Sequence, residues 1–351
     1  ANTLFLGAFA LWKSTDGGSN WTLSNSIPSG DPYGGFLTHC DHHSIGFVPG
    51  DVNKMYDCND GGVYYSSDQG ASWNFKGKGL NTFQIYQIGS AKTSPNLALL
   101  AARDNGVSAA DLTDTTHTWY YVYAGDGFSP VVDHTNANTW YAAGFYVGRG
   151  KSINSGLSFS PINNGISEST WYYTPLEMDP FNPQILYTAA DSNIYKTTNG
   201  GNQWTPSAAI RDIQIIAIDK INSNVVYASN RVWWANTTSK IYRTKNGGSN
   251  WIQVSCPAEY ITDLEADPVK AGTVYATAYN YNAGKQIWKS IDTGNTWINI
   301  TGNYPPIPAN SITINPHNTN HLYIGSDVGM YFSEDGGVTW NDFNNNLPNV
   351  S

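Results

Sequence analysis

The sequence is poor in the residues that helices and charged binding surfaces need. Only 13% of its 351 residues are charged, and it contains three methionines. Aromatic and β-branched residues alternate instead with Gly, Asn, Ser and Thr, a pattern typical of many short strands. The net charge of −9 argues against nucleic acid as a partner. No apolar run approaches the roughly 20 residues that a membrane-spanning helix requires.

Cysteine is also scarce, with Cys40, Cys58 and Cys256 as the only three. No Cys-x-x-Cys pattern occurs, which argues against thiol zinc sites and redox motifs. Cys40 and Cys58 fall on neighbouring strands of one repeat, so a disulfide between them is one alternative. The chain has no signal peptide and starts at Ala1, and we therefore expect a processed or excised fragment. The 40% of hydrophobic residues excludes a disordered chain.

One pattern, which we call the repeat motif, recurs along the whole chain. It consists of Ser or Thr, then Asp or Asn two residues later, Gly two further, and Trp or Phe three beyond that. Seven copies span residues 14–21, 66–73, 152–159, 197–204, 244–251, 290–297 and 333–340. The gap between the second and third copies is about twice the others, and a degenerate copy lies in it at Leu112, Asp114, Thr116 and Trp119. Eight units of about 44 residues match the blades of a β-propeller.

The repeat motif resembles the Asp box, or bacterial neuraminidase repeat, of sialidases, xyloglucanases, sortilin-type receptors and many secreted bacterial propellers. In that motif the acidic or amide side chain accepts turn N–H groups and the glycine takes a positive φ. The sequence thus predicts an all-β fold, a β-propeller of four-stranded blades. We count eight repeats, with seven blades as the alternative, and place the motif in the turn between the third and fourth strands. Residues 1–351 form one domain in this interpretation, and the first unit lacks its inner strand, so ring closure would need a strand after Ser351.

The most unusual segment is Thr38-His39-Cys40-Asp41-His42-His43, just before the inner strand of the second unit. With the strand period of two, His39, Asp41 and His43 would project to one side. Imidazole and carboxylate ligands suit a divalent metal, so these three residues form a candidate site for zinc or calcium. A hydrogen-bonded plug at the mouth of the channel is the simpler alternative.

Three further acidic loops belong to the same face of the fold. They are Asn59-Asp60-Gly61-Gly62, Arg103-Asp104-Asn105-Gly106 and Gly125-Asp126-Gly127, from successive units. Asp60, Asp104 and Asp126 are candidate catalytic carboxylates, because glycoside hydrolysis needs an acid and a base across a sugar. The order of these loops resembles that of a group of secreted Asp-box proteins, in which Gln is usual at the position of Arg103. Arg103 and Asn105 are candidate ligand-binding residues.

Aromatic side chains supply a second candidate surface on that face. Flat aromatic rings beside amide and carboxylate groups suit sugar binding. The candidate ligand-binding residues are Trp171, Tyr172, Trp233, Trp234, Tyr279 and Tyr281, with Tyr304 nearby. The alternative is that these rings only cover hydrophobic loop bases.

Two functions remain open from the sequence. The first is an extracellular propeller, secreted or at the cell surface, that recognises polysaccharide or glycan and resembles glycoside hydrolases. Sialidase activity is disfavoured, because the five arginines include no plausible triad for a substrate carboxylate. The second is a non-catalytic adhesion or assembly module that binds another protein.

Overall fold

The computed structural model describes residues 2–24, 38–80, 83–116, 118–145, 148–169, 173–230 and 238–344. Strands and turns make up this part of the chain. It contains no helix of the length and apolarity needed to cross a membrane. The composition explains the result, since residues that favour strands and tight turns dominate.

The strands form eight consecutive antiparallel sheets, seven of four strands and one of three. The first sheet is β1 (Leu4–Gly7), β2 (Leu11–Ser14) and β3 (Thr22–Leu23). The second is β4 (His42–Val48), β5 (Asp51–Asn59), β6 (Gly62–Ser66) and β7 (Asn74–Phe75), and the third is β8 (Ile85–Ala91), β9 (Ser94–Ala102), β10 (Val107–Asp111) and β11 (Tyr120–Tyr123). The fourth is β12 (Gly127–Val132), β13 (Trp140–Gly144), β14 (Gly148–Ser152) and β15 (Ser160–Pro161).

The remaining four sheets repeat the same order. The fifth is β16 (Leu176–Met178), β17 (Leu186–Ala189), β18 (Ile194–Thr197) and β19 (Thr205–Ala208), and the sixth is β20 (Ile213–Ile218), β21 (Val226–Asn230), β22 (Ile241–Thr244) and β23 (Ile252–Val254). The seventh is β24 (Ile261–Ala266), β25 (Val274–Ala278), β26 (Ile287–Ser290) and β27 (Ile298–Asn299). The eighth is β28 (Ala309–Ile314), β29 (Leu322–Ser326), β30 (Gly329–Ser333) and β31 (Asn341–Asp342). The fold is a β-propeller of eight blade-like sheets, as the repeats predict.

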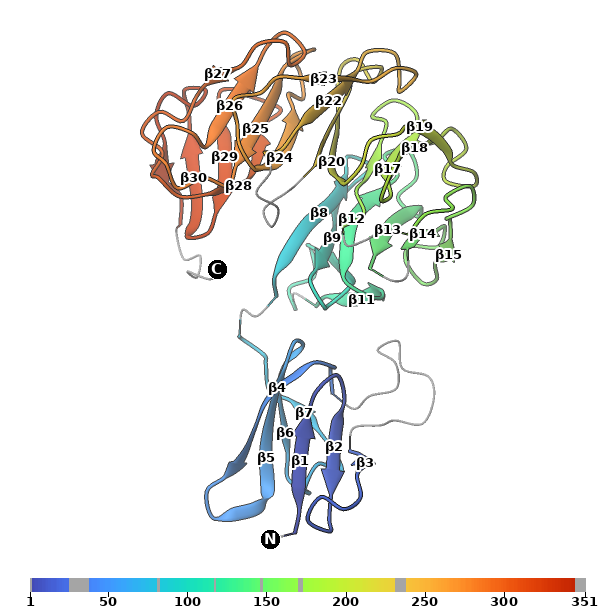
Figure 1. Ribbon diagram of the computed structural model, residues 1–351, viewed down its shortest axis with the longest axis vertical. Helices are drawn as coiled ribbons and strands as arrows, with labels where there is room; N and C mark the ends of the chain where they lie inside the picture. Colours follow the sequence, from blue (N-terminus) through green and yellow to red (C-terminus); the bar gives the residue numbers. More distant parts are fainter. Residues whose placement is uncertain are drawn as a thin grey trace.

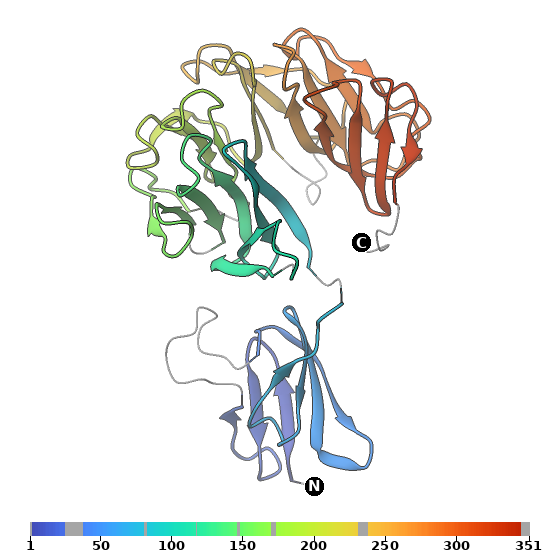
Figure 2. The same ribbon diagram turned by 180° about the vertical axis from the view of Figure 1, so that it is seen from behind.

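The sheets are arranged as an arc and a pair. The third to eighth sheets follow one another around the arc, and each inner strand packs on the inner strand of the next sheet (Figure 1). The first and second sheets pack together through β1 and β4 and lie below the arc in both views (Figures 1 and 2). The chain passes from the pair to the arc between β7 and β8.

The seven complete copies of the repeat motif form one recurring turn before the last strand of their sheets. In the copy that begins at Ser290, the Ser290 hydroxyl accepts the Gly294 N–H at 2.8 Å and donates to Asp292 Oδ1 at 2.8 Å. Asp292 Oδ1 also accepts the Thr296 N–H at 2.9 Å. Gly294 has a φ of +79°, which a residue with a side chain rarely adopts. The hydrogen bonds and the positive glycine φ expected of the motif are therefore present. The degenerate copy at Asp114 lies between β10 and β11.

The same turn also joins neighbouring sheets. Lys196 stacks on Tyr187 of its own sheet and donates to the Gly247 carbonyl, in the motif of the next sheet, at 2.7 Å. Equivalent bonds run from the cation of one sheet to the fourth residue of the next motif: Lys13 to Gln69, Lys151 to Gly200 and Arg243 to Thr293. The residues whose carbonyl oxygens accept these bonds all have a positive φ, between 58° and 64°. The repeat motif therefore supplies both a hairpin turn and an inter-sheet contact.

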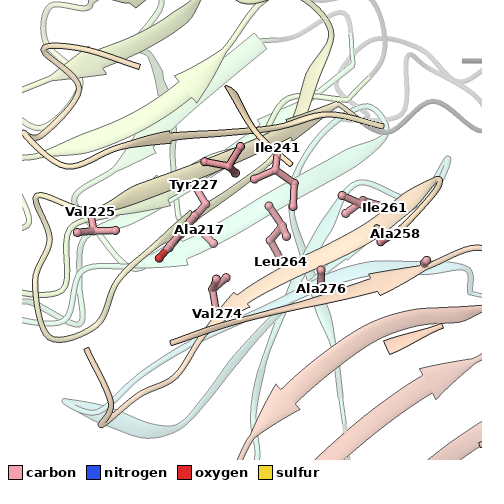
Figure 3. Packing of buried hydrophobic residues seen from close by; sticks show 11 residues of the cluster. Ala217, Val225, Tyr227, Ile241, Ala258, Ile261, Leu264, Val274 and Ala276 are labelled. Atoms are coloured by element: carbon pink, nitrogen blue, oxygen red, sulfur yellow. The ribbon is translucent and has the colours of Figure 1, made fainter. Parts of the chain in front are cut away.

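The hydrophobic core consists of layers between successive sheets. Figure 3 shows the layer between the sixth and seventh sheets, where Tyr227 and Ile241 face Leu264 and Val274. All four side chains are almost completely buried. Burial of each such side chain stabilises the fold by about 1.5–3 kcal/mol. These layers set the positions of the loops described next.

Candidate functional site

Asp60, Asp104 and Asp126, which we call the carboxyl cluster, come together where the second sheet meets the arc. Asp60 lies in the β5–β6 turn, Asp104 lies in the β9–β10 turn, and Asp126 directly precedes β12. The Asp104 N–H donates to Asp126 Oδ1 at 2.6 Å, and the two carboxyl groups are also hydrogen-bonded. The Asn105 amide donates to the Asp60 carbonyl at 3.0 Å. The convergence of these loops, predicted from their order in the chain, is present in the structure.

Two glycines permit the close approach of the loops. A Cβ on Gly127 would lie 2.0 Å from the Gly106 carbonyl oxygen, so the Asp126 loop can rest against the Asp104 loop only with glycine there. A Cβ on Gly61 would lie 2.4 Å from Cβ of His39. Asp60 and Asp126 are therefore each followed by a residue without a side chain because another chain segment takes that space.

The electrostatics of the carboxyl cluster single out Asp104. Burial, the hydrogen bond that the protonated Asp104 carboxyl donates to Asp126, and the negative charges of Asp126 and Asp60 raise the pKa of Asp104 to about 7. The Arg103 guanidinium lies 3.2 Å from Asp104 Oδ2 and only partly opposes this rise. Near neutral pH the Asp104 carboxyl is thus a proton donor beside two other carboxyl groups, with 28% of its side chain exposed.

On the side of the second sheet, His43 forms a hydrogen bond with Asp60 of the carboxyl cluster. Its Nε2 is hydrogen-bonded to Asp60 Oδ1, and this bond is the main cause of a raised His43 pKa. The His43 side chain is largely exposed, whereas Asp60 is mostly covered. The His43–Asp60 hydrogen bond thus joins β4 to the β5–β6 turn that carries Asp60.

The expectation that His39, Asp41 and His43 share one side of a strand is wrong. β4 begins only at His42, and Asp41 has a left-handed φ of 58°, which breaks the alternation. His39 is buried, and its ring nitrogens lie 3.0 Å from the Cys40 carbonyl and 2.8 Å from the Asp104 carbonyl. Within the described ranges, no three His, Cys, Asp or Glu side chains are arranged to hold a metal ion. The residues of the candidate zinc or calcium site do not fit a metal.

The cysteines likewise do not pair. Cys58 lies opposite Ser44 in the β4–β5 register, while Cys40 precedes β4 and donates to Asp41 Oδ2 at 3.2 Å. All three cysteines are free. Burial is the main cause that raises the pKa of the Cys40 thiol to about 12, so it stays protonated.

A buried pair that the sequence analysis missed supports this site. His42 Nδ1 lies 2.8 Å from both carboxylate oxygens of Asp57, and the Asn59 amide donates to the same carboxylate at 2.9 Å. Both side chains of the pair are fully buried. The only signal of this pair in the sequence is Asp57, a charged residue at an inward-facing position of the long strand β5. The pair fixes β4 against β5 and thereby places His43 next to Asp60.

The aromatic candidates are described only in part. Trp171, Tyr172, Trp233 and Trp234 lie outside the described residues. Tyr279 and Tyr281 follow β25 and form an edge-to-face pair with ring centroids 5.6 Å apart. Both rings are exposed.

A carboxylate and an amide that the sequence analysis did not identify adjoin this tyrosine pair. The Tyr281 hydroxyl donates to Asp327 Oδ2 at 3.4 Å, and the Asn310 amide donates to Asp327 Oδ1 at 2.7 Å. Tyr304, by contrast, is buried in the core with its hydroxyl bonded to the Pro308 carbonyl, so it is not a surface residue. Exposed rings beside a carboxylate and an amide are the arrangement suited to a sugar.

No family model matches this chain. It is 25% identical over 166 residues to a xyloglucanase from Paenibacillus sp, a match that spans 45% of this chain and 16% of that protein. Among solved structures it is similar to YCF48 from Cyanidioschyzon merolae, with a TM-score of 0.51 and 14% identity over 84% of this chain and 94% of the other. A gluconolactonase from Xanthomonas campestris has a TM-score of 0.51 and 9% identity over 71% and 85% of the two chains. These structural similarities support the β-propeller fold.

Proposed function

We propose that this protein is an extracellular Asp-box β-propeller that recognises glycans on the face bearing the carboxyl cluster and the tyrosine pair. The hydrogen bonds of the seven repeat motifs support the Asp-box assignment. The match to a xyloglucanase favours a β-glucan such as xyloglucan as the ligand class. Polysaccharides of this kind are met outside cells, which favours secretion or surface attachment.

The observation that carries a hydrolytic role is the pKa of about 7 at Asp104 beside Asp126 and Asp60. In acid–base catalysis, the general acid is a group whose environment raises its pKa, and the base is a neighbouring group whose pKa is not raised. Asp104 would give its proton to the leaving oxygen of the glycosidic bond. Asp60, hydrogen-bonded to His43, would activate the attacking water.

Asp126 has a different role in this proposal. It is hydrogen-bonded directly to Asp104, whereas a sugar between two catalytic carboxyl groups separates them by about 5–9 Å. Asp126 is therefore a positioning residue that raises the Asp104 pKa. Arg103 and Asn105 border the same loop and supply donors for sugar hydroxyls.

Reducing-sugar release from xyloglucan tests the hydrolytic role. Asp104→Asn and Asp60→Asn should each lower turnover at least 100-fold, because each removes one half of the acid–base pair. Asp126→Asn should lower the Asp104 pKa and so shift the alkaline limb of the pH–rate profile to lower pH rather than abolish turnover. Asp111→Asn, at an exposed carboxylate at the end of β10, is the matched control and should be silent. Unchanged turnover in Asp104→Asn would remove the carboxyl cluster from the mechanism.

Binding is tested separately by affinity electrophoresis in xyloglucan gels. Tyr281→Ala should weaken retardation, and Trp171→Ala and Trp233→Ala test the aromatic residues outside the described part. Retardation that is absent, or indifferent to all three substitutions, would refute glycan recognition.

The second candidate function, a protein-binding assembly module, is favoured by apolar side chains exposed on the first three sheets. They include Leu6, Phe9, Tyr56, Ile88 and Tyr120. Exposed apolar side chains mark an interaction surface where they adjoin one another. Glycan binding lost in Tyr281→Ala but kept in Leu6→Asp would separate the two functions.

A further inference from the structure

The second and third sheets follow one another along the chain, but the structure does not pack them face to face. In both views the strands of the first and second sheets, which we call the sheet pair, extend away from the arc (Figures 1 and 2). The two parts meet at one end, in the carboxyl cluster. There the Asn105 amide donates to the Asp60 carbonyl, and His39 Nε2 lies 2.8 Å from the Asp104 carbonyl.

The third sheet exposes residues that the corresponding strands of other sheets bury. The two positions concerned lie at the start of each inner strand and beyond the bulge that follows. In the third sheet they hold Ile85 and Ile88, in the sixth Ile213 and Ile216, and in the seventh Ile261 and Leu264. The residues of the sixth and seventh sheets are buried against the preceding sheet. Ile85 and Ile88, by contrast, are 50% and 64% exposed.

The second sheet exposes the opposite half of such a layer. Tyr56 lies opposite the inner strand β4 in the same register in which Tyr227 and Tyr275 lie opposite β20 and β24. Tyr227 and Tyr275 are fully buried, because each packs on the inner strand of the following sheet. Tyr56 is 44% exposed. The Tyr56 face and the Ile88 face thus correspond to the two sides of one inter-sheet layer.

The sequence explains why this layer is open. Other neighbouring sheets are joined by a cation that donates to the next repeat motif, as Lys13 of the first sheet donates to Gln69 of the second. In the second sheet Tyr65 takes the position of the cation, since it lies opposite Tyr56 as Arg243 lies opposite Tyr227. The motif of the third sheet is the degenerate copy. This boundary therefore has neither the cation nor the complete motif, and only apolar packing is left to close it.

We propose that the sheet pair is a lid that closes on the arc, so that Tyr56 packs against Ile85 and Ile88 as Tyr227 packs against Leu264 (Figure 3). Burial of these apolar side chains favours the closed form, and the missing carbonyl bond leaves the open form accessible. The loops of the carboxyl cluster form the pivot, because they already join the two parts.

Closure also regulates the site proposed above. Asp60 moves with the sheet pair, whereas Asp104 and Asp126 move with the arc. The position of the proposed base relative to the proposed acid therefore depends on closure. This consequence rests on the hydrolytic role, whereas closure itself does not.

Hydroxyl-radical footprinting with mass spectrometry tests closure, because it reports the exposure of single side chains in the whole chain. Tyr227, which is buried, and Tyr120, which is exposed, are internal references. In the parent, Tyr56 should be labelled at most one-fifth as fast as Tyr120. Ile88→Asp should raise Tyr56 labelling at least fivefold, because a carboxylate opposes burial in an apolar layer. Leu157→Asp, at an exposed position in the motif turn of the fourth sheet, is the matched control and should leave Tyr56 unchanged.

A second variant approaches the layer from the other side. Tyr56→Ser should raise the labelling of Ile85 and Ile88 at least threefold. Small-angle X-ray scattering should give a larger radius of gyration for Tyr56→Ser and for Ile88→Asp than for the parent. Because these side chains are exposed in the open form, both variants should keep the circular dichroism spectrum of the parent.

Turnover separates the lid from the hydrolytic role. If xyloglucan is hydrolysed, Ile88→Asp should lower turnover at least tenfold although it leaves every member of the carboxyl cluster in place. Unchanged turnover in this variant, with raised Tyr56 labelling, would refute the link between closure and the site. An inactive parent whose Tyr56 labelling still responds to Ile88→Asp would refute the hydrolytic role and support the lid.

Two results would overturn the lid itself. One is Tyr56 labelling in the parent that equals that of Tyr120 and does not respond to Ile88→Asp. The other is protection of Tyr56 that appears only with a dimer in light scattering, which would mean that a second copy of the chain covers this face.

Discussion

Replacing Asp104 by Asn should make the protein more stable at neutral and alkaline pH. The surroundings raise the pKa of this carboxyl from 3.8 to about 7, so ionisation is unfavourable in the folded protein. Each pKa unit corresponds to 1.36 kcal/mol, which gives an upper value of about 4 kcal/mol. Because the side chain is 28% exposed and Arg103 lies close by, we expect a gain of about 2–4 kcal/mol for the variant.

The gain depends on pH in a defined direction. Between pH 3.8 and about 7 the folded state holds a proton on Asp104 that the unfolded state has released. The stability of the parent therefore falls as pH rises through this window, and the variant, which has no proton to lose, escapes that loss. The difference between the two proteins should be small at pH 4 and largest above pH 7.

Urea unfolding at pH 4, 6 and 8, followed by tryptophan fluorescence, measures this difference. Asp111→Asn is the control, because the hydrogen bonds from Thr113 lower the pKa of Asp111 and its replacement should not be stabilising at any pH. A stability difference for Asp104→Asn that is constant across pH, or that favours the parent at pH 8, would refute the electrostatic account of the carboxyl cluster.

Three further outcomes follow from other contacts. Ser290→Ala should lower the free energy of unfolding by about 1–3 kcal/mol, because the buried Gly294 N–H loses its acceptor; denaturant titration checks this. Asp60→Asn should lower the His43 pKa towards its ordinary value, and an unchanged NMR titration of the His43 ring would contradict the pairing. Gly127→Ala should destabilise the protein by about 1–3 kcal/mol, because its Cβ would meet a carbonyl oxygen of the β9–β10 turn, and thermal unfolding would show no shift if that close approach were absent.

The repeats made the sheets predictable. In the fifth sheet, the sequence places strands at 174–179, 185–189, 193–197 and from 204 onward, and the structure has them at Leu176–Met178, Leu186–Ala189, Ile194–Thr197 and Thr205–Ala208. The prediction succeeds because the repeat motif determines its own turn through local hydrogen bonds, which depend on neighbouring residues only. Errors of one or two residues occur at strand ends, where no such local bond exists.

For the candidate site, the sequence predicted only the contacts that follow from the order of the loops along the chain. Asp60 and Asp104 lie in the turns between the second and third strands of successive sheets, and Asp126 lies in the connection that enters the next sheet, so the order of the chain brings all three to the same end of neighbouring sheets. The pairing of His42 with Asp57 depends instead on a register shift between His42 and Ser44, which no residue pattern announces. Likewise, the left-handed backbone at Asp41 defeats an argument from strand alternation.

The carbonyl bonds between neighbouring sheets have a consequence for how these repeats tolerate change over evolution. The fourth residue of the motif serves through its backbone oxygen, which is why Gln69, Gly200, Gly247 and Thr293 can all occupy it. Substitutions at this position should accumulate freely as long as the backbone keeps a positive φ. An insertion or deletion of one residue inside the turn would instead move this carbonyl oxygen away from the Lys or Arg side chain of the preceding sheet that donates to it. The repeat should thus drift in side-chain identity while its length stays fixed.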